Sequence, residues 1–353
     1  MRFSAETANR LPEAGSRAPD AGSRSPGTDS NNLKRNIMSD QSTQRKVVVV
    51  GAGAVGATYS YALAQSGLAD EIVLIDRNED LAKGQVLDLI HGQPYFPTVD
   101  IRTGSPDDYA DANVIVITAG AAQKPGETRL ELLRKNAEIT GAITEEIASR
   151  DSKGVMLIVS NPVDIMTYVA LKRSGWERGR VIGSGTVLDS SRFRHLLSKH
   201  CDVDVHNVHA YILGEHGDSE FAAWSMTHVG GINIDKYCPL CRKCSDWKNE
   251  RKLIEQQVRE SAYHIISYKG STHYAVGLAM VRITGAILRG ENSVMTVSTY
   301  LDGEFGLKDV CLSVPSIVSD KGVKRIIESP LSAEEITLLN RSAEILREAA
   351  GSI

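Results

Sequence analysis

A glycine-rich turn between two apolar segments constrains the fold of this chain more than any other feature. Residues 47–50 are four valines, and the sequence GAGAVG that follows them contains Gly51, Gly53 and Gly56. The first glycine permits a tight turn, the second lets a pyrophosphate approach the backbone, and the third lets a helix pack closely on a strand. The pattern predicts a strand that turns into a helix, with an ordinary glycine turn as the alternative.

The next residues complete a β–α–β unit. Residues 54–65 predict an apolar helix, residues 71–75 predict a second buried strand, and Asp76 follows directly. A carboxylate at this point accepts hydrogen bonds from the hydroxyls of an adenosine ribose and repels a 2′-phosphate, while the helix N-terminus attracts the pyrophosphate. The sequence therefore predicts NAD as the cofactor rather than NADP.

Strand-like and helical segments alternate through the first half of the chain. Strands are expected at 114–118, 155–159 and 180–182, and helices at roughly 79–91, 129–149 and 164–174. Apolar strands separated by helices are typical of a parallel sheet covered on both faces, whose ligands bind beyond the carboxyl ends of the strands. We therefore expect an α/β fold with a Rossmann-type doubly wound parallel sheet.

The pattern changes after residues 183–185. Helices are expected at roughly 189–200, 248–269 and 274–289, and strands at 294–300 and 310–318. A last helix is expected to begin at Ser332, which forms a capping-box pattern with Glu335. The sequence thus predicts an NAD-binding domain at 45–183 and a C-terminal α+β substrate domain at 184–353, with the site in the cleft between them.

The N-terminal segment differs from the rest of the chain. It is rich in Ala, Gly, Ser, Pro and Arg and has few large apolar residues, so we expect residues 1–44 to be a disordered extension. It lacks the apolar core of a secretory signal, and it contains acidic residues, which transit peptides avoid. Met38 is a possible true start, which mass spectrometry of the native N-terminus tests; an intact residue 2 would contradict it.

Composition excludes several classes of partner. The net charge is −4, and no basic patch interleaved with aromatic residues occurs, which argues against nucleic acid. No apolar run approaches the length of a membrane span. Five cysteines do not suggest a disulfide framework, which favours the cytoplasm. Cys238, Cys241 and Cys244 have the spacing of part of a metal site but no nearby fourth ligand, so we favour surface-loop thiols over a bound metal.

The sequence GEHGD contains the histidine best placed for chemistry. It follows a strand-like segment at 209–213, and His216 stands before a glycine at the strand's end. Reduction of a ketone needs a proton donor near neutral pH, which imidazole provides when a carboxylate orients it. Asp189 is the candidate carboxylate, with a helix N-cap as the alternative. Arg192, one turn further on, is placed to bind a substrate carboxylate, or is an exposed helix arginine.

Two loops after predicted strands carry further candidates. Residues 123–129 read QKPGETR and contain a Pro-Gly turn dipeptide, which suggests a mobile flap rather than a solvated polar loop. Asn161, in the sequence SNP, is either an Asx-turn residue or a ligand donor.

Six segments in one order resemble a known family. They read GAGAVG, QKPGETR, SNPVD, GTVLDSSRFR, GEHGD and KGST. On these segments the chain from about Lys46 to the C-terminus resembles the lactate/malate dehydrogenase family, and within it the bacterial L-lactate dehydrogenases. The resemblance implies reversible hydride transfer between NADH and pyruvate, which gives L-lactate and NAD. It also implies that the protein is a cytoplasmic homotetramer that acts in glycolysis and fermentation. Alternatives are a dehydrogenase for malate or a larger 2-hydroxy acid, and a non-catalytic NAD-binding protein.

The resemblance also implies roles for individual residues. His216 is implied to be the proton donor and acceptor, with Asp189 as its orienting partner. Arg192 is implied to bind the substrate carboxylate, while Arg129 on the flap and Asn161 contact the ketone oxygen. The further residues that it implies are Thr272 beside the substrate and, for the cofactor, Gly51, Gly53, Val55, Gly56, Asp76, Gly120, Ala121, Val159, Asn161 and Val276.

Three other positions bear on specificity and regulation. Malate dehydrogenases of the family carry arginine where this chain has Gln123, and a neutral glutamine cannot neutralise a second substrate carboxylate in a water-poor site. This favours pyruvate over oxaloacetate. Arg194 and His209 match the positions at which the bacterial enzymes bind fructose 1,6-bisphosphate across a subunit interface. The alternatives are a surface arginine and a buried histidine.

Overall fold

The structure, a computed structural model, describes residues 44–122, 126–241 and 246–353. Most of the expected N-terminal extension, Gln123 of the flap and Cys244 of the cysteine cluster lie outside these ranges, so what the sequence predicts for them stays a prediction. Within the described ranges, no helix is both long and apolar enough to cross a membrane.

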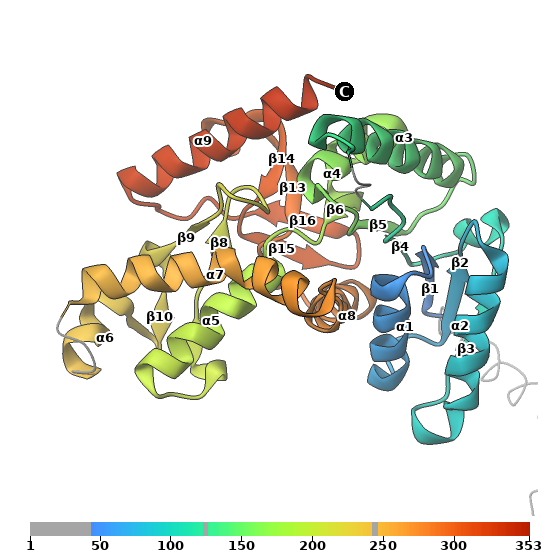
Figure 1. Ribbon diagram of the computed structural model, residues 1–353, viewed down its shortest axis with the longest axis horizontal. Coiled ribbons are helices and arrows are strands. Elements are labelled where there is room, and N and C mark those ends of the chain that lie inside the picture. Colours follow the sequence, from blue (N-terminus) through green and yellow to red (C-terminus); the bar gives the residue numbers. More distant parts are fainter. Residues whose placement is uncertain (1–43, 123–125, 242–245) are drawn as a thin grey trace, which may run out of the picture. The chain divides into compact units, whose positions relative to one another are not determined.

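An eight-stranded sheet forms the centre of the described chain (Figure 1). Its strands, in spatial order, are β14 (Lys308–Ser313), β13 (Ser298–Asp302), β6 (Val181–Gly183), β5 (Val155–Ile158), β4 (Val114–Ile117), β1 (Lys46–Val50), β2 (Glu71–Ile75) and β3 (Asp100–Thr103). The six strands from β6 to β3 pair in parallel, which confirms the predicted doubly wound sheet. The C-terminal half extends this sheet with the antiparallel strands β13 and β14.

Helices cover both faces of the sheet. The helices of the described residues are α1 (Ala54–Ser66), α2 (Glu79–His91), α3 (Arg129–Ala148), α4 (Val163–Ser174), α5 (Val187–Cys201), α6 (Ile234–Cys241), α7 (Trp247–Lys269), α8 (Tyr274–Arg289) and α9 (Ala333–Ala350). Of these, α6 packs on the small sheet of β10 (His228–Val229) and β11 (Ile232–Asn233), and α7 packs on α5. Every helix expected from the sequence is present, and the predicted capping box of Ser332 and Glu335 begins α9. Helix α6 is an addition that the sequence did not indicate.

The alternation of side chains along the strands explains this two-sided packing. In β1, Val47 and Val49 belong to the apolar cluster that contains residues of α1, α2 and α8. Val48 and Val50 belong to the cluster that contains residues of α3, α4 and α9. Successive strand residues point to opposite faces, so a run of valines buries both faces of the sheet at once.

Two long apolar segments predicted as single strands are each divided between two sheets. The predicted strand at 294–300 is β12 (Ser293–Met295) plus β13, and that at 310–318 is β14 plus β15 (Ser316–Ser319). Strands β12, β15 and β16 (Gly322–Ile326) form a separate three-stranded sheet. The prediction was wrong because the apolar pattern continues through the crossings. Pro315, which lacks an N–H group, marks the second crossing.

The segment predicted as one strand at 209–213 is also divided. It forms β7 (Val208–His209) and β8 (Ile212–Leu213), which pair in different small sheets. Strand β7 pairs with β10 (His228–Val229), which also pairs with β11 (Ile232–Asn233), whereas β8 pairs with β9 (Phe221–Ala222). The GEHGD segment leaves β8 and is tied back by mutual backbone hydrogen bonds between Gly214 and Ser313 of β14.

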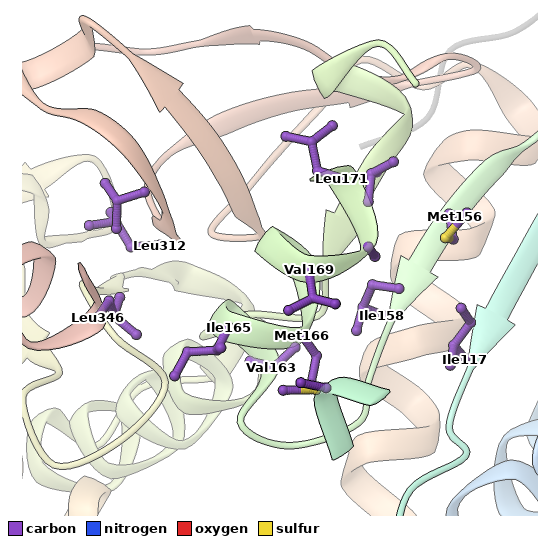
Figure 2. Packing of buried hydrophobic residues seen from close by; sticks show 14 of the residues in the cluster. Ile117, Met156, Ile158, Val163, Ile165, Met166, Val169, Leu171, Leu312 and Leu346 are labelled. Atoms are coloured by element: carbon purple, nitrogen blue, oxygen red, sulfur yellow. The ribbon is translucent and has the colours of Figure 1, made fainter. Parts of the chain in front are cut away.

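Helix α4 is held between the central sheet and α9. Figure 2 shows Ile165 on the side of Leu346 and Met166 on the side of Ile158. All four side chains are buried in one apolar cluster that draws residues from both halves of the chain. This packing fixes the N-terminus of α4 at the carboxyl end of β5, where the sequence SNPVD begins the helix.

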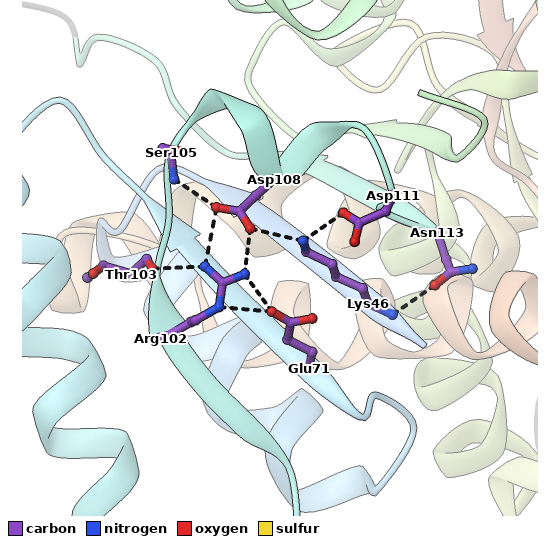
Figure 3. Close-up of polar contacts among 8 residues, drawn as sticks. All are labelled: Lys46, Glu71, Arg102, Thr103, Ser105, Asp108, Asp111 and Asn113. Atoms are coloured by element: carbon purple, nitrogen blue, oxygen red, sulfur yellow. Dashed lines mark hydrogen bonds and ion pairs between the residues drawn. The ribbon is translucent and has the colours of Figure 1, made fainter. Parts of the chain in front are cut away.

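A network of charged side chains joins the amino-terminal ends of β1 and β2 to β3 and to the segment that follows β3 (Figure 3). Lys46 Nζ lies 2.9 Å from Asp108 and 2.7 Å from Asp111, and Arg102 contacts both Asp108 and Glu71. Although burial acts in the opposite direction, Arg102 and Lys46 hold the pKa of Asp108 well below its usual range. The network lies far from the glycine turn, at the opposite ends of β1 and β2. We therefore infer that it stabilises the pairing of the three strands and has no part in the functional site.

Candidate active site

The turn from β1 into α1 has the geometry that its glycines predict. Gly51 has a φ of +110°, a conformation that favours glycine. A Cβ atom added at Gly56 would lie 1.9 Å from the carbonyl oxygen of Gly51, so the close contact between helix and turn requires glycine. Asp76 accepts a hydrogen bond from the N–H of Ala52 at 2.7 Å, which fixes its carboxylate beside the turn.

Gly53 leaves space at the N-terminus of α1. It is the N-cap residue, no side chain caps the helix there, and a Cβ atom added at Gly53 would meet no described atom within 4 Å. The first N–H groups of a helix attract anions. An open approach to these groups, with a fixed carboxylate at the end of β2, fits the pyrophosphate and ribose of a dinucleotide.

Loops from β4 and β5 meet at the same edge of the sheet. Asn136, in α3, accepts a hydrogen bond from the N–H of Ala121 at 2.8 Å and donates one to the carbonyl of Asn161 at 3.1 Å. It therefore ties together two loops that contain predicted cofactor positions, among them Gly120. Asn136 was not among the predicted site residues, although its place on the apolar side of the predicted helix was a usable signal.

Three apolar positions implied for the cofactor also come together. Val55 lies in the first turn of α1, Val159 follows β5, and Val276 lies in the first turn of α8. All three are partly buried against one apolar cluster. Helix α8 lies beside α1 (Figure 1), with Gly277 of α8 close enough to Thr58 that an added Cβ atom would touch it. A helix of the C-terminal half thus borders the glycine turn.

Asp189, His216 and Arg192 form one hydrogen-bonded group. Asp189 Oδ2 lies 2.7 Å from His216 Nδ1, and Arg192 Nη1 donates to Asp189 Oδ1 at 2.6 Å. Asp189 is 1% exposed and lies inside α5, whose N-cap is Thr186, so the N-cap alternative is wrong. The side chain of Arg192 is only 14% exposed, so the alternative of an exposed arginine is wrong as well.

The electrostatics of this group keep a proton on the histidine. Burial opposes the charge on His216, but the charge and hydrogen bond of Asp189 raise the pKa of His216 to about 9. Burial likewise opposes ionisation of Asp189, but His216 and Arg192 hold its pKa below the ordinary value. At neutral pH the pair is an imidazolium beside a carboxylate. His216 Nε2 has no hydrogen-bond partner among the described residues, which leaves it available to a ligand.

Two buried carboxyl groups beside His216 were missed by sequence analysis. Asp164, in the first turn of α4, is 2% exposed, and its Oδ2 accepts a hydrogen bond from the backbone N–H of His216 at 2.7 Å. Burial raises the pKa of Asp164 to about 6. Glu220, next to β9, is 6% exposed, and its carboxyl lies within 4.8 Å of ligand atoms of Asp189 and His216. The available signal was an acidic residue adjoining an apolar run in each case.

Two family models together match nearly the whole described chain. Residues 45–183 match the NAD-binding domain of lactate/malate dehydrogenase, and residues 186–352 match its alpha/beta C-terminal domain. The chain belongs to the lactate/malate dehydrogenase family. It is therefore an NAD-dependent oxidoreductase, which confirms the cofactor predicted from the glycine turn and Asp76.

Its relatives include curated bacterial members of this family. An L-lactate dehydrogenase of Treponema denticola is 61% identical over 306 residues, which cover 87% of this chain and 97% of that protein. An L-lactate dehydrogenase of Acetivibrio thermocellus is 50% identical, over 88% of this chain and 98% of that protein. The predicted resemblance to bacterial L-lactate dehydrogenases is confirmed.

Solved structures agree with this assignment. MGS-M5, a lactate dehydrogenase enzyme from a Medee basin deep-sea metagenome library, superposes with a TM-score of 0.85 at 43% identity, covering 88% of this chain and 99% of that one. The minor L-lactate dehydrogenase of Enterococcus mundtii, in a ligands-bound form, gives a TM-score of 0.85 at 42% identity with the same coverage.

Two further residues predicted to contact the substrate, Arg129 and Thr272, lie on other elements. Arg129 is the exposed first residue of α3, and its charge acts on Tyr263, whose hydroxyl donates to Asp218 of the GEHGD segment at 2.8 Å. Thr272 is half-buried in the loop between α7 and α8. Among the described residues, neither Arg129 nor Thr272 is hydrogen-bonded to His216.

The two predicted effector positions lie on adjacent elements. Arg194, in α5, donates from Nε to the carbonyl of Ala210 at 3.0 Å and lines a cavity of about 350 Å³ that Arg282 of α8 also lines. His209, in β7, precedes Ala210 and is exposed, so the alternative of a buried histidine is wrong.

The cysteine cluster is partly helical. Cys238 is buried and Cys241 half-buried, and both lie in α6, where the thiol of Cys241 donates to the carbonyl of Cys238 at 3.2 Å. The expectation that these two thiols lie in a surface loop was therefore wrong.

Proposed function

We propose that this protein is an L-lactate dehydrogenase, which reduces pyruvate to L-lactate with NADH and catalyses the reverse reaction. The observation that carries the proposal is the buried group of His216, Asp189 and Arg192, joined by contacts of 2.7 and 2.6 Å. It combines an acid–base histidine with a cation for a carboxylate, which are the two groups that a 2-keto acid requires. The names of the bacterial relatives support the same substrate.

In the proposed reaction the cofactor supplies a hydride to the ketone carbon. His216 donates its proton from Nε2 to the ketone oxygen, so that the carbonyl becomes a hydroxyl, and later regains a proton from water. Asp189 holds Nδ1 and stabilises the imidazolium from which the proton leaves. In lactate oxidation the neutral imidazole accepts the hydroxyl proton instead.

The substrate is proposed to be oriented by side chains from several loops. Arg192 binds its carboxylate, because a guanidinium forms two parallel hydrogen bonds with a carboxylate. Arg129 and Asn161 polarise the ketone oxygen, and Thr272 lies beside the substrate. Arg129 is the last residue of the segment predicted to be a flap, so we propose that this segment closes over the bound keto acid.

The cofactor is proposed to lie across the carboxyl ends of the parallel strands. We propose that residues 45–183 form the NAD-binding domain and 184–353 the substrate domain, a division supported by the extent of the two family models. The proposed cofactor residues are Gly51, Gly53, Val55, Gly56, Asp76, Gly120, Ala121, Val159, Asn161 and Val276.

Alanine substitutions of two glycines separate cofactor binding from folding. Gly53→Ala is expected to leave the unfolding temperature close to that of the native protein, because the added methyl group meets no described atom. It should weaken NADH binding on the order of tenfold, because the pyrophosphate needs close approach at this position. Gly56→Ala is expected to lower the free energy of unfolding by about 1–3 kcal/mol, because its methyl group overlaps the turn. Thermal unfolding and NADH titration measure both effects. Native-like NADH affinity in Gly53→Ala would contradict the proposed path of the pyrophosphate.

Substrate choice is proposed to depend on Gln123. Gln123→Arg is expected to shift the ratio of kcat/KM for pyruvate and oxaloacetate towards oxaloacetate, because the new guanidinium pairs with the second carboxylate. Steady-state kinetics with both keto acids measure the shift, with Gln123→Asn as the control that adds no charge. The same ratio before and after the Arg substitution would contradict this role.

Regulation by fructose 1,6-bisphosphate is proposed to act through Arg194 and His209 in a cytoplasmic homotetramer that serves fermentation. An arginine and a histidine from facing subunits suit a phosphate group. Large exposed apolar side chains on α2, α7 and α8 support assembly with further copies of the chain; they include Leu87, Tyr268, Tyr274 and Leu278.

The effector proposal is tested by adding fructose 1,6-bisphosphate to the native protein and to Arg194→Leu. The bisphosphate is expected to lower the KM for pyruvate and to stabilise the tetramer in the native protein only, since the two effects must be linked. The proposal would be overturned if the bisphosphate changed neither the KM for pyruvate nor the sedimentation behaviour of the native protein.

A further inference from the structure

The carboxyl group of Glu220 is a buried acid that the proposed mechanism does not use. The residue is 6% exposed and directly precedes β9. Its side chain forms no hydrogen bond or ion pair with the described residues, yet its carboxyl lies within 4.8 Å of the ligand atoms of Asp189 and His216. An ionised carboxylate that is buried without a partner destabilises the folded protein. Burial beside the acid–base pair therefore favours the neutral, protonated form of Glu220.

The groups facing Glu220 come from several packed elements. From α5 come Asp189 and Arg192, from the GEHGD segment comes His216, and from α7 comes Arg259. Burial and the charge of Asp189 raise the pKa of Glu220 to about 9, against the three cations. The carboxyl of Glu220 is thus neutral at neutral pH. Asp189 is also buried, but its direct contacts with His216 and Arg192 keep it ionised.

The other acid near the histidine acts in the same direction. Asp164 of α4 accepts the backbone N–H of His216, and Glu215 contributes a further negative charge to the surroundings of Asp164. The charges of Asp189, Asp164 and Glu220 all favour the protonated form of His216. Of these three acids, Glu220 is the one without a hydrogen bond to the histidine, so its influence is purely electrostatic and depends on whether it has lost its proton.

We propose that Glu220 is a positioning residue that carries its own proton at neutral pH and, on losing it in alkaline solution, keeps His216 protonated. This inference rests on the proposed function of His216 as proton donor. The ionised form of Glu220, within 4.8 Å of the pair, stabilises the imidazolium where the histidine would otherwise lose its proton. The two groups titrate as a coupled unit, and reduction of the keto acid extends to higher pH.

A proton fits this position better than a metal ion. Asp189, His216 and Glu220 could in principle offer three ligand atoms to a divalent cation. Both oxygens of Asp189 are already bound, one by His216 and one by the guanidinium of Arg192 at 2.6 Å. That guanidinium and the charge of Arg259 repel a divalent cation, whereas a single proton on Glu220 only neutralises its carboxylate.

The test is the pH dependence of kcat/KM for pyruvate reduction in the native protein and Glu220→Gln, with chelator present. Glutamine has the shape of the neutral acid but cannot ionise. We expect the alkaline fall in kcat/KM to begin about one pH unit lower in Glu220→Gln, so that above this point the variant is about tenfold slower than the native protein. The two proteins should differ much less at neutral pH. Glu220→Asp, which keeps an ionisable group, should fall between them.

A matched control is Glu335→Gln. Glu335 lies in the first turn of α9, is 5% exposed and accepts a hydrogen bond from the backbone N–H of Ser225 at 3.0 Å. It is not among the main groups that act on His216 or Glu220. Its substitution should leave the alkaline fall in kcat/KM at the native pH. The proposal is overturned if Glu220→Gln keeps the native alkaline limit, if it loses activity equally at every pH, or if the difference between the two proteins is present only without chelator. A native protein that does not oxidise NADH with pyruvate at all would instead refute the proposed function.

Discussion

Replacing His216 with alanine is expected to lower kcat for pyruvate reduction by about a hundredfold or more. The imidazole is the group that delivers the proton, and its pKa of about 9 keeps it charged at the pH at which the reduction runs. Without it, the developing alkoxide has to take a proton from water. Stopped-flow measurement of a single turnover, with NADH affinity measured separately, distinguishes this chemical defect from a binding defect. NADH affinity should stay near the native value.

The chain offers a matched control for this experiment. His206 Nδ1 lies 2.7 Å from Asp204 Oδ1, the same separation as in the His216–Asp189 pair, but the side chain of His206 is 91% exposed. His206→Ala is therefore expected to keep native kcat. A His216→Ala protein with native kcat would show that another group donates the proton.

Replacing Arg192 with leucine is expected to lower kcat/KM for pyruvate by about a hundredfold to a thousandfold. The guanidinium is proposed to bind the substrate carboxylate and also donates to Asp189 at 2.6 Å. Its loss leaves one carboxylate of the substrate and one of the enzyme short of a partner in a largely buried site. Arg192→Lys restores the charge but not the planar pair of donors, so its kcat/KM should lie between those of the native protein and Arg192→Leu.

An exposed arginine serves as the comparison for this substitution. Arg173 of α4 also donates to a carboxylate, that of Glu145 at 2.8 Å, but its side chain is 59% exposed. Arg173→Leu is expected to change kcat/KM little, because exposed ion pairs contribute little. If Arg192→Leu raised the KM for pyruvate no more than Arg173→Leu does, Arg192 would not be the carboxylate ligand.

Much of this site could be predicted from local sequence patterns. The glycine turn, the apolar strands and Asp76 are close together in sequence, and their geometry is dictated by backbone conformation and strand order. Asp189 and Arg192 are three residues apart on one helix, so helical spacing placed them on the same face, although their direct contact was not predicted. His216 was recognised from its place after a strand, although that strand proved to be two short ones.

The residues that sequence reasoning missed depend on tertiary packing. Asp164, Glu220 and Asn136 are each polar residues whose burial results from elements distant in sequence: α4 against the sheet, β9 against α5, and α3 against two loops. Their places in or beside apolar runs were only weak signals of burial, because polar residues at such places are usually solvated. The divided strands around Pro315 were missed for a related reason, since an apolar run looks the same whether it stays in one sheet or crosses to another.

The most direct test of the proposed function follows the absorbance of NADH during turnover with pyruvate and, separately, with oxaloacetate. With a neutral residue at position 123 and the group of His216, Asp189 and Arg192 intact, we predict rapid oxidation with pyruvate and a much lower kcat/KM with oxaloacetate. A clear preference for oxaloacetate, or no oxidation of NADH with either keto acid, would contradict the assignment.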